Sequence, residues 1–101
     1  MRDAELLAIT AEFRAGILNG ESPTMRCFMV SAPLAAYLRM IGVDCETVES
    51  DLGEMNHVWI RLSDGRALDP TASQFNTLFP DMGLPDVYLG PPLTIHSERT
   101  P

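Results

Sequence analysis

The chain has 101 residues, of which 46% are hydrophobic, so it has enough material for one domain with a packed core and no room for a second. Fourteen acidic residues against seven basic ones give a net charge of −7, which argues against nucleic acid or an anionic membrane as the main partner, because both require a basic surface. No apolar run approaches the ~20 residues of a membrane span, and no signal-peptide core follows the mixed-charge start. We therefore expect a cytoplasmic protein.

The first segment, from Asp3 to Leu18, is predicted to be a helix that ends at Asn19-Gly20, with Gly20 as a left-handed cap. Its apolar residues recur at spacings of three and four, which places them on one face. These residues are Leu6, Ile9, Phe13 and Ile17.

A second helix is predicted between Met25 and Ile41, where the sequence is apolar almost all round and favours a buried helix. Pro33 lies inside it and leaves two alternatives, because proline removes a backbone hydrogen bond and clashes with the preceding turn. Either the helix kinks at Pro33, or a short turn around Cys27 leads into a helix that begins near Ser31.

The middle of the chain is predicted to form strands. Residues 43–49 read as a weak strand and residues 50–55 as a polar loop. Residues 57–62 alternate well, with His57, Trp59 and Arg61 on one face, and residues 66–69 form the returning strand.

A Pro-rich C-terminal tail, residues 80–101, is expected to pack on the body through its apolar residues, with one short strand at 87–89. We expect one α+β domain over residues 1–101, with N-terminal helices packed on a small antiparallel sheet.

Three residues in this arrangement can carry nucleophilic chemistry, namely Cys27, His57 and Asp69. A thiol is a good nucleophile only as the thiolate; a neighbouring histidine can take its proton, and a third group can fix the imidazole. Taken singly, each residue also has a purely structural interpretation. Cys27 could be a small buried hydrophobic residue, His57 a half-buried strand residue and Asp69 a turn residue before proline. Their order, a helix start followed by two strands, favours a joint role.

The turn between the two strands decides whether His57 and Asp69 share a face. With a two-residue loop, Asp69 points away from His57. With residues 63–65 as the loop, Trp59 lies opposite Asp69, and His57 becomes its diagonal neighbour at roughly 7–8 Å, within reach of its side chain. Three-residue hairpin loops favour a left-handed glycine at the third position, where Gly65 stands.

The stretch from Cys27 to Thr71 resembles the transglutaminase-like branch of the papain-like cysteine proteases. It is similar also to the bacterial peptidases that trim lasso-peptide leaders. Members begin a helix with the catalytic cysteine, then carry a Leu-Arg pair, a glycine, a strand, His-x-Trp and an Asp-Pro-Thr after a hairpin. This chain has Cys27, Leu38-Arg39, Gly42, His57-Val58-Trp59 and Asp69-Pro70-Thr71 in that order.

The resemblance implies a papain-like core with Cys27 as nucleophile, His57 as general base and Asp69 as the orienting carboxylate. The helix start and the imidazolium would favour the thiolate, and the Cys27 backbone N–H would hold part of the oxyanion. Many relatives have a glutamine upstream of the cysteine as an oxyanion donor. No glutamine precedes Cys27, so Ser22 or Thr24 would take that place.

The sequence also gives expectations for Trp59, Cys45 and His96, and for a metal site and a cofactor. Trp59 lies on the face of His57 and either walls the substrate cleft or packs in the core. Cys45 is expected in the core, with redox pairing to Cys27 as a minor alternative, and His96 is expected to be solvated. We expect no metal site, because the Cys27–Cys45 and His57–His96 gaps do not match zinc-ligand spacings, and no cofactor, because no phosphate or dinucleotide motif occurs.

The sequence therefore predicts a cysteine-dependent acyl-transfer hydrolase that acts on a peptide or protein, as a peptidase or as an amidase or deamidase. A toxin or effector would use the same residues on a host protein. The alternative is a catalytically inactive binding or assembly module. Met25 in place of a family glycine, Pro33 in the helix and the missing glutamine favour the alternative, and the intact Cys27, His57 and Asp69 favour the enzyme.

Overall fold

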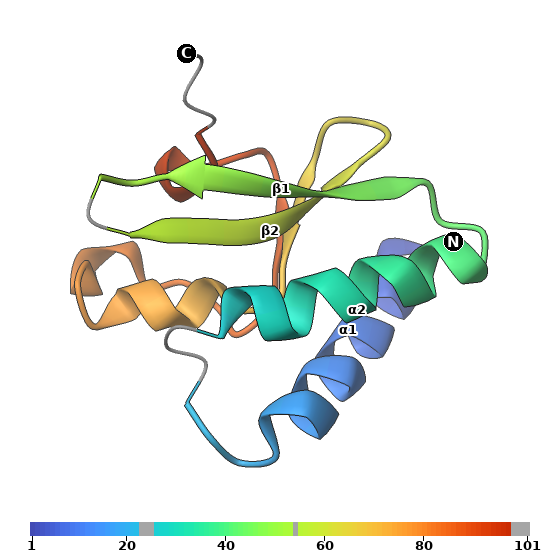
Figure 1. Ribbon diagram of the computed structural model, residues 1–101, viewed down its shortest axis with the longest axis horizontal. Coiled ribbons are helices and arrows are strands. Elements are labelled where there is room, and N and C mark those ends of the chain that lie inside the picture. Colours follow the sequence, from blue (N-terminus) through green and yellow to red (C-terminus); the bar gives the residue numbers. More distant parts are fainter. Residues whose placement is uncertain (23–25, 54, 98–101) are drawn as a thin grey trace.

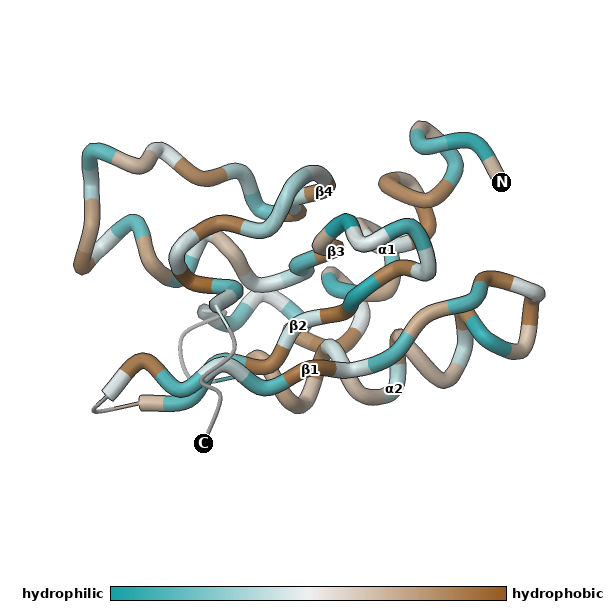
Figure 2. The backbone as a smooth tube through the Cα atoms, turned by 90° about the horizontal axis from the view of Figure 1, so that it is seen from above, coloured by the Kyte–Doolittle hydropathy of each residue, from teal (hydrophilic) through white to brown (hydrophobic). Residues whose placement is uncertain are grey.

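The computed structural model describes residues 1–22, 26–53 and 55–97 and shows two helices packed on a four-stranded antiparallel sheet (Figure 1). The strands are β1 (Cys45–Asp51), β2 (Asn56–Leu62), β3 (Ala67–Asp69) and β4 (Tyr88–Gly90). Their order across the sheet follows their order in the chain, as the view from above shows (Figure 2). The expected α+β class, with N-terminal helices on a small antiparallel sheet, is confirmed.

Helix α1 (Asp3–Leu18) has the predicted bounds. Its C-cap is Asn19, which is in the left-handed conformation at φ 49° and donates its N–H to the carbonyl of Ala15. The prediction placed this cap one residue later, at Gly20, whose φ is also positive. Asparagine tolerates this conformation better than most residues, so it can end the helix itself.

Helix α2 (Cys27–Met40) runs through Pro33 and begins at Cys27, so the alternative start near Ser31 is wrong. Proline deprives the carbonyl four residues earlier of its donor. That carbonyl belongs to Met29, on a side of the helix that faces solvent. The expectation of a wholly buried helix is also wrong, because Phe28 is 66% and Met40 84% exposed.

The β2–β3 hairpin has the predicted three-residue loop. Arg61 pairs with Ala67, and the N–H of Leu62 donates to the carbonyl of Arg66 at 2.9 Å. Residues 63–65 therefore form the loop, and Gly65 has the left-handed φ of 90° that this loop favours.

The described residues form two apolar clusters in the core. The first lies between the helices and the sheet and includes Leu34, Leu38 and Ile60. The second joins Phe75 to Leu84 and Ile95, and so includes residues from the C-terminal segment. Together with the pairing of β4 to β3, this cluster holds the segment from residue 84 to 96 against the rest of the chain. None of the helices in the described ranges has the length and hydropathy needed to cross a bilayer.

Candidate active site

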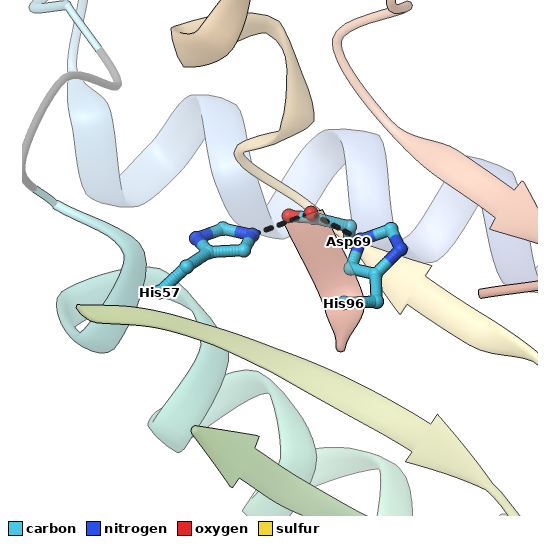
Figure 3. A group of neighbouring side chains, drawn as sticks. All are labelled: His57, Asp69 and His96. Carbon is cyan, nitrogen blue, oxygen red and sulfur yellow. Dashed lines mark hydrogen bonds and ion pairs between the residues drawn. The ribbon is translucent and has the colours of Figure 1, made fainter. Parts of the chain in front are cut away.

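The hairpin register brings His57 and Asp69 together. His57 Nε2 lies 2.6 Å from Asp69 Oδ2, and both side chains are fully buried (Figure 3). The register of β2 with β3 continues to Trp59 opposite Asp69, so His57 is the diagonal neighbour that a three-residue loop requires. The predicted contact between these two side chains is confirmed.

Thr71 fixes the other oxygen of the same carboxylate. The Thr71 N–H donates to Asp69 Oδ1 at 3.0 Å, and the Thr71 hydroxyl lies 3.4 Å from the same oxygen. This is the local turn that aspartate forms with the backbone two residues later. The Asp-Pro-Thr sequence therefore sets the orientation of the carboxylate, with one oxygen held by its own turn and the other directed at His57.

Cys27 is the first residue of α2 and lies against the start of β2. The Ser31 hydroxyl, one turn after Cys27, donates to the Val58 carbonyl at 3.1 Å, which ties the N-terminal part of α2 to the strand that carries His57. The Cys27 residue is 9% exposed, and its thiol lies close enough to His57 for the imidazole to lower the pKa of the thiol. Because Asp69 occupies His57 Nε2, the thiol faces the Nδ1 side of the ring, which points away from Asp69 (Figure 3). Gln74 Nε2 also lies 3.2 Å from this nitrogen.

The electrostatics of the group favour charge separation. Burial alone raises the pKa of Cys27, but hydrogen bonds with His57 and with the backbone of Val58 outweigh it, so the pKa of the thiol is lowered. Burial alone lowers the pKa of His57, but hydrogen bonds with Asp69 and Cys27 raise it to about 9. The two pKa values therefore shift in the directions that favour a thiolate–imidazolium pair.

Burial would likewise raise the pKa of Asp69, but hydrogen bonds from His57 and His96 hold it below its usual range. The buried carboxylate therefore stays ionised.

His96, expected to be solvated, is 2% exposed and lies on the opposite side of Asp69 from His57 (Figure 3). Its Nε2 is 2.8 Å from Asp69 Oδ2, the same oxygen that His57 contacts. The expectation was wrong because β4 and Ile95 draw the C-terminal segment onto the site. The apolar residues of this tail indicated that it packs on the body, but they did not indicate which residues it would contact.

Gln74 and Phe75 also contact His57, and the sequence analysis did not predict these contacts. The amide of Gln74 places its Nε2 3.2 Å from His57 Nδ1 and donates to the Thr71 hydroxyl at 3.2 Å. The Phe75 ring meets the His57 ring edge-on, with centroids 4.7 Å apart. Both belong to the short helix Ala72–Asn76, and the three-residue spacing from Thr71 to Gln74 on a helical turn could have indicated their contact.

The remaining predicted residues lie elsewhere. Trp59 is fully buried, donates its indole N–H to Ser50 Oγ at 2.9 Å and packs on the His96 ring, so it is a core residue. Ser22 is exposed on the chain between the helices, and Thr24 lies outside the described residues. Cys45 is buried as a free thiol beside the Ala35 carbonyl, at the opposite end of the β1–β2 pair from His57, which excludes pairing with Cys27 in this conformation.

His57, Asp69 and His96 bring three potential metal ligands within 4.8 Å of one another, a cluster that spacing rules did not reveal. A neutral histidine that binds a metal through Nε2 carries its proton on Nδ1 and donates it to a neighbour. His96 Nδ1 instead accepts the N–H of Leu93 at 3.0 Å, so its proton is on Nε2 and points at Asp69. Hydrogen bonds to the Asp69 carboxylate explain why the three side chains lie together. Because the His96 Nε2 atom carries a proton, it is not available to bind a cation.

Comparisons of the chain with family models, with characterised proteins and with solved structures return no match. The family resemblance therefore rests on the residue pattern, and the activity it implies is a proposal.

Proposed function

We propose that this chain is a cysteine-dependent acyl-transfer hydrolase with a transglutaminase-like, papain-like core, acting as a peptidase or as an amidase or deamidase. One observation carries the proposal: the Asp69 carboxylate contacts one side of a buried imidazole, and the Cys27 thiol lies close enough to the same imidazole for each to shift the pKa of the other. A nucleophile, a base and an orienting group in contact are what activation of a thiol requires.

In the proposed reaction, Cys27 Sγ attacks the carbonyl carbon of an amide, and the carbonyl oxygen takes the negative charge. The C–N bond then breaks as the His57 imidazolium gives its proton to the leaving nitrogen, which leaves a thioester on Cys27. Water, deprotonated by His57, attacks the thioester and releases the acid and the thiol. Asp69 remains ionised and holds the imidazole in place throughout.

The start of α2 supplies the proposed oxyanion contact. Cys27 is the first helical residue, so its backbone N–H has no acceptor within the helix. The N–H groups at this end also carry the positive pole of the helix dipole. When the carbonyl carbon is bonded to Cys27 Sγ, the carbonyl oxygen would develop its negative charge beside these N–H groups.

The proposed substrate is a peptide or protein that presents an apolar side chain near the bond to be broken. A cavity of about 380 Å³, lined by Leu52, Met55, Phe79 and Ile95 among others, also has Phe75 in its wall, and Phe75 contacts His57. On the side of the nucleophile, Phe28 is 66% exposed directly after Cys27.

The test is alkylation of thiols across pH, with mass spectrometry to locate the label, on the wild type and on His57→Ala. We expect Cys27 to react with an apparent pKa well below the ~8.5 of a free thiol, and to return towards that value without His57. Cys45 in the same molecule is the matched control, because burial raises its pKa.

If Cys27 titrates as a free thiol in the folded wild type, the catalytic proposal is wrong and the chain is an inactive binding module. If the thiol is activated, release of ammonia from glutamine peptides indicates a deamidase, and new peptide termini indicate a peptidase.

A further inference from the structure

Asp69 Oδ2 is shared between two imidazoles. His57 Nε2 lies at 2.6 Å and His96 Nε2 at 2.8 Å from this single oxygen (Figure 3). Thr71 holds the other oxygen, so the orientation of the carboxylate does not depend on His96. A second imidazole on Oδ2 therefore has an electrostatic consequence beyond positioning the carboxylate.

The protonation of His96 follows from its two hydrogen bonds. Its Nδ1 accepts the backbone N–H of Leu93 at 3.0 Å, so Nδ1 carries no proton. Its Nε2, at 2.8 Å from a carboxylate that can only accept, must be the donor. His96 is thus held in the tautomer that carries its proton on Nε2.

We propose that His96 is a positioning residue that acts through Asp69: by donating a second hydrogen bond to Oδ2, it weakens the hold of the carboxylate on the His57 proton. This inference rests on the proposed function, in which His57 must release that proton to the leaving nitrogen. An oxygen that accepts two hydrogen bonds is a weaker partner for each of them, because each donor neutralises part of the same charge.

The other titratable groups around the site do not take this role. His57 is faced by Cys27 from α2 and by Asp69 from β3, and His96 lies with its ring centroid 6.0 Å away. Tyr88 from β4 stacks on His96 at 5.6 Å, but its hydroxyl donates to the Pro91 carbonyl at 2.6 Å.

The test compares His96→Phe, which keeps a ring but loses the donor, with His96→Gln, whose amide nitrogen can reach the position of Nε2. Tyr88→Phe is the matched control, because it removes only the hydroxyl of the ring that stacks on His96 and leaves Asp69 untouched. The readouts are the pKa of His57, followed by NMR of its ring nitrogens, and the alkylation profile of Cys27.

In His96→Phe we expect the pKa of His57 to rise by roughly one unit, the size of the effect of one hydrogen bond to a charged group, and Cys27 to be alkylated at lower pH. Hydrolysis of an amide substrate should slow, because a more basic His57 donates its proton less readily. His96→Gln and Tyr88→Phe should stay close to the wild type in the His57 pKa.

An unchanged or lowered His57 pKa in a folded His96→Phe variant would overturn the inference. So would NMR of the wild type that finds the His96 proton on Nδ1, a measurement that does not depend on whether a variant folds. A free-thiol titration of Cys27 in the wild type would reject the proposed function and leave the effect of His96 on His57 measurable on its own.

Discussion

At the scale of single residues, Asp69 is the group on which the site depends. It is fully buried and its charge is compensated by His57, His96 and Thr71. Removing that charge while keeping the shape of the side chain isolates its effect on the imidazole.

In Asp69→Asn we expect the pKa of His57 to fall from about 9 to 6.5 or below, because burial then acts on the imidazolium without a compensating carboxylate. NMR titration of the ring measures the change, and Cys27 should lose its activation with it. Asp64→Asn, at an exposed carboxyl bonded to Arg66, is the control. A His57 pKa that stays near 9 in Asp69→Asn would show that Asp69 is not the cause of the shift.

The raised pKa of His57 also makes the free energy of unfolding depend on pH. The pKa of His57 is higher in the folded chain than its ordinary 6.5, so its contribution is complete below 6.5 and is lost as the pH rises through about 9. The lowered pKa of Cys27 acts in the opposite direction. In Cys27→Ser, where the thiol no longer titrates, we therefore expect the unfolding free energy to fall over this window, and Asp69→Asn in the same background to flatten the fall.

At the scale of elements, the β2–β3 hairpin sets the register on which the site depends. Gly65 has φ 90° with open space where a Cβ would be, so the strain of a substitution is in the backbone alone. Gly65→Ala should cost about 1–2 kcal/mol of unfolding free energy, measured by urea denaturation, because a left-handed conformation is unfavourable for L-residues.

Gly16→Ala is the matched control. Gly16 lies in α1, and a Cβ there also meets nothing within 4 Å. Alanine is the better helix former, so this variant should gain roughly 0.5–1 kcal/mol. Equal effects of the two substitutions would mean that the backbone conformation at Gly65 is not what limits the hairpin.

The hairpin also explains which parts of the site could be predicted. The contact of His57 with Asp69 follows from loop length and strand alternation, which are local in the sequence. The bounds of α1 follow from local periodicity in the same way. The contact of Asp69 with His96 depends on β4 returning to pair with β3 after residues 70–87, and no pattern in the sequence sets the register of that return. The exposed side of α2 was missed because its apolar residues carry no sign of which face meets the sheet.

At the scale of the whole molecule, the C-terminal segment is held by the second apolar cluster. Ile95 is 3% exposed and lies beside His96 in the chain. Ile95→Ala should cost about 2–5 kcal/mol of unfolding free energy, because it removes buried methyl groups and leaves a cavity. Leu78→Ala, at a side chain 62% exposed in the same region, should change stability by no more than about 0.5 kcal/mol. A small loss in Ile95→Ala would show that this cluster does not hold the segment.

The sheet order follows the chain order, so each strand pairs with its neighbour in sequence. The β1–β2 and β2–β3 pairs are hairpins, which form within ~1–10 μs, whereas β4 joins across the longer segment 70–87. Cys27 is not part of this series, because it lies on a helix that must dock on the sheet from outside. We therefore expect the acidity of the thiol to appear only with that docking. In a refolding experiment, the reactivity of Cys27 would therefore report when α2 docks on the sheet. The formation of the β2 strand that carries His57 would be followed separately.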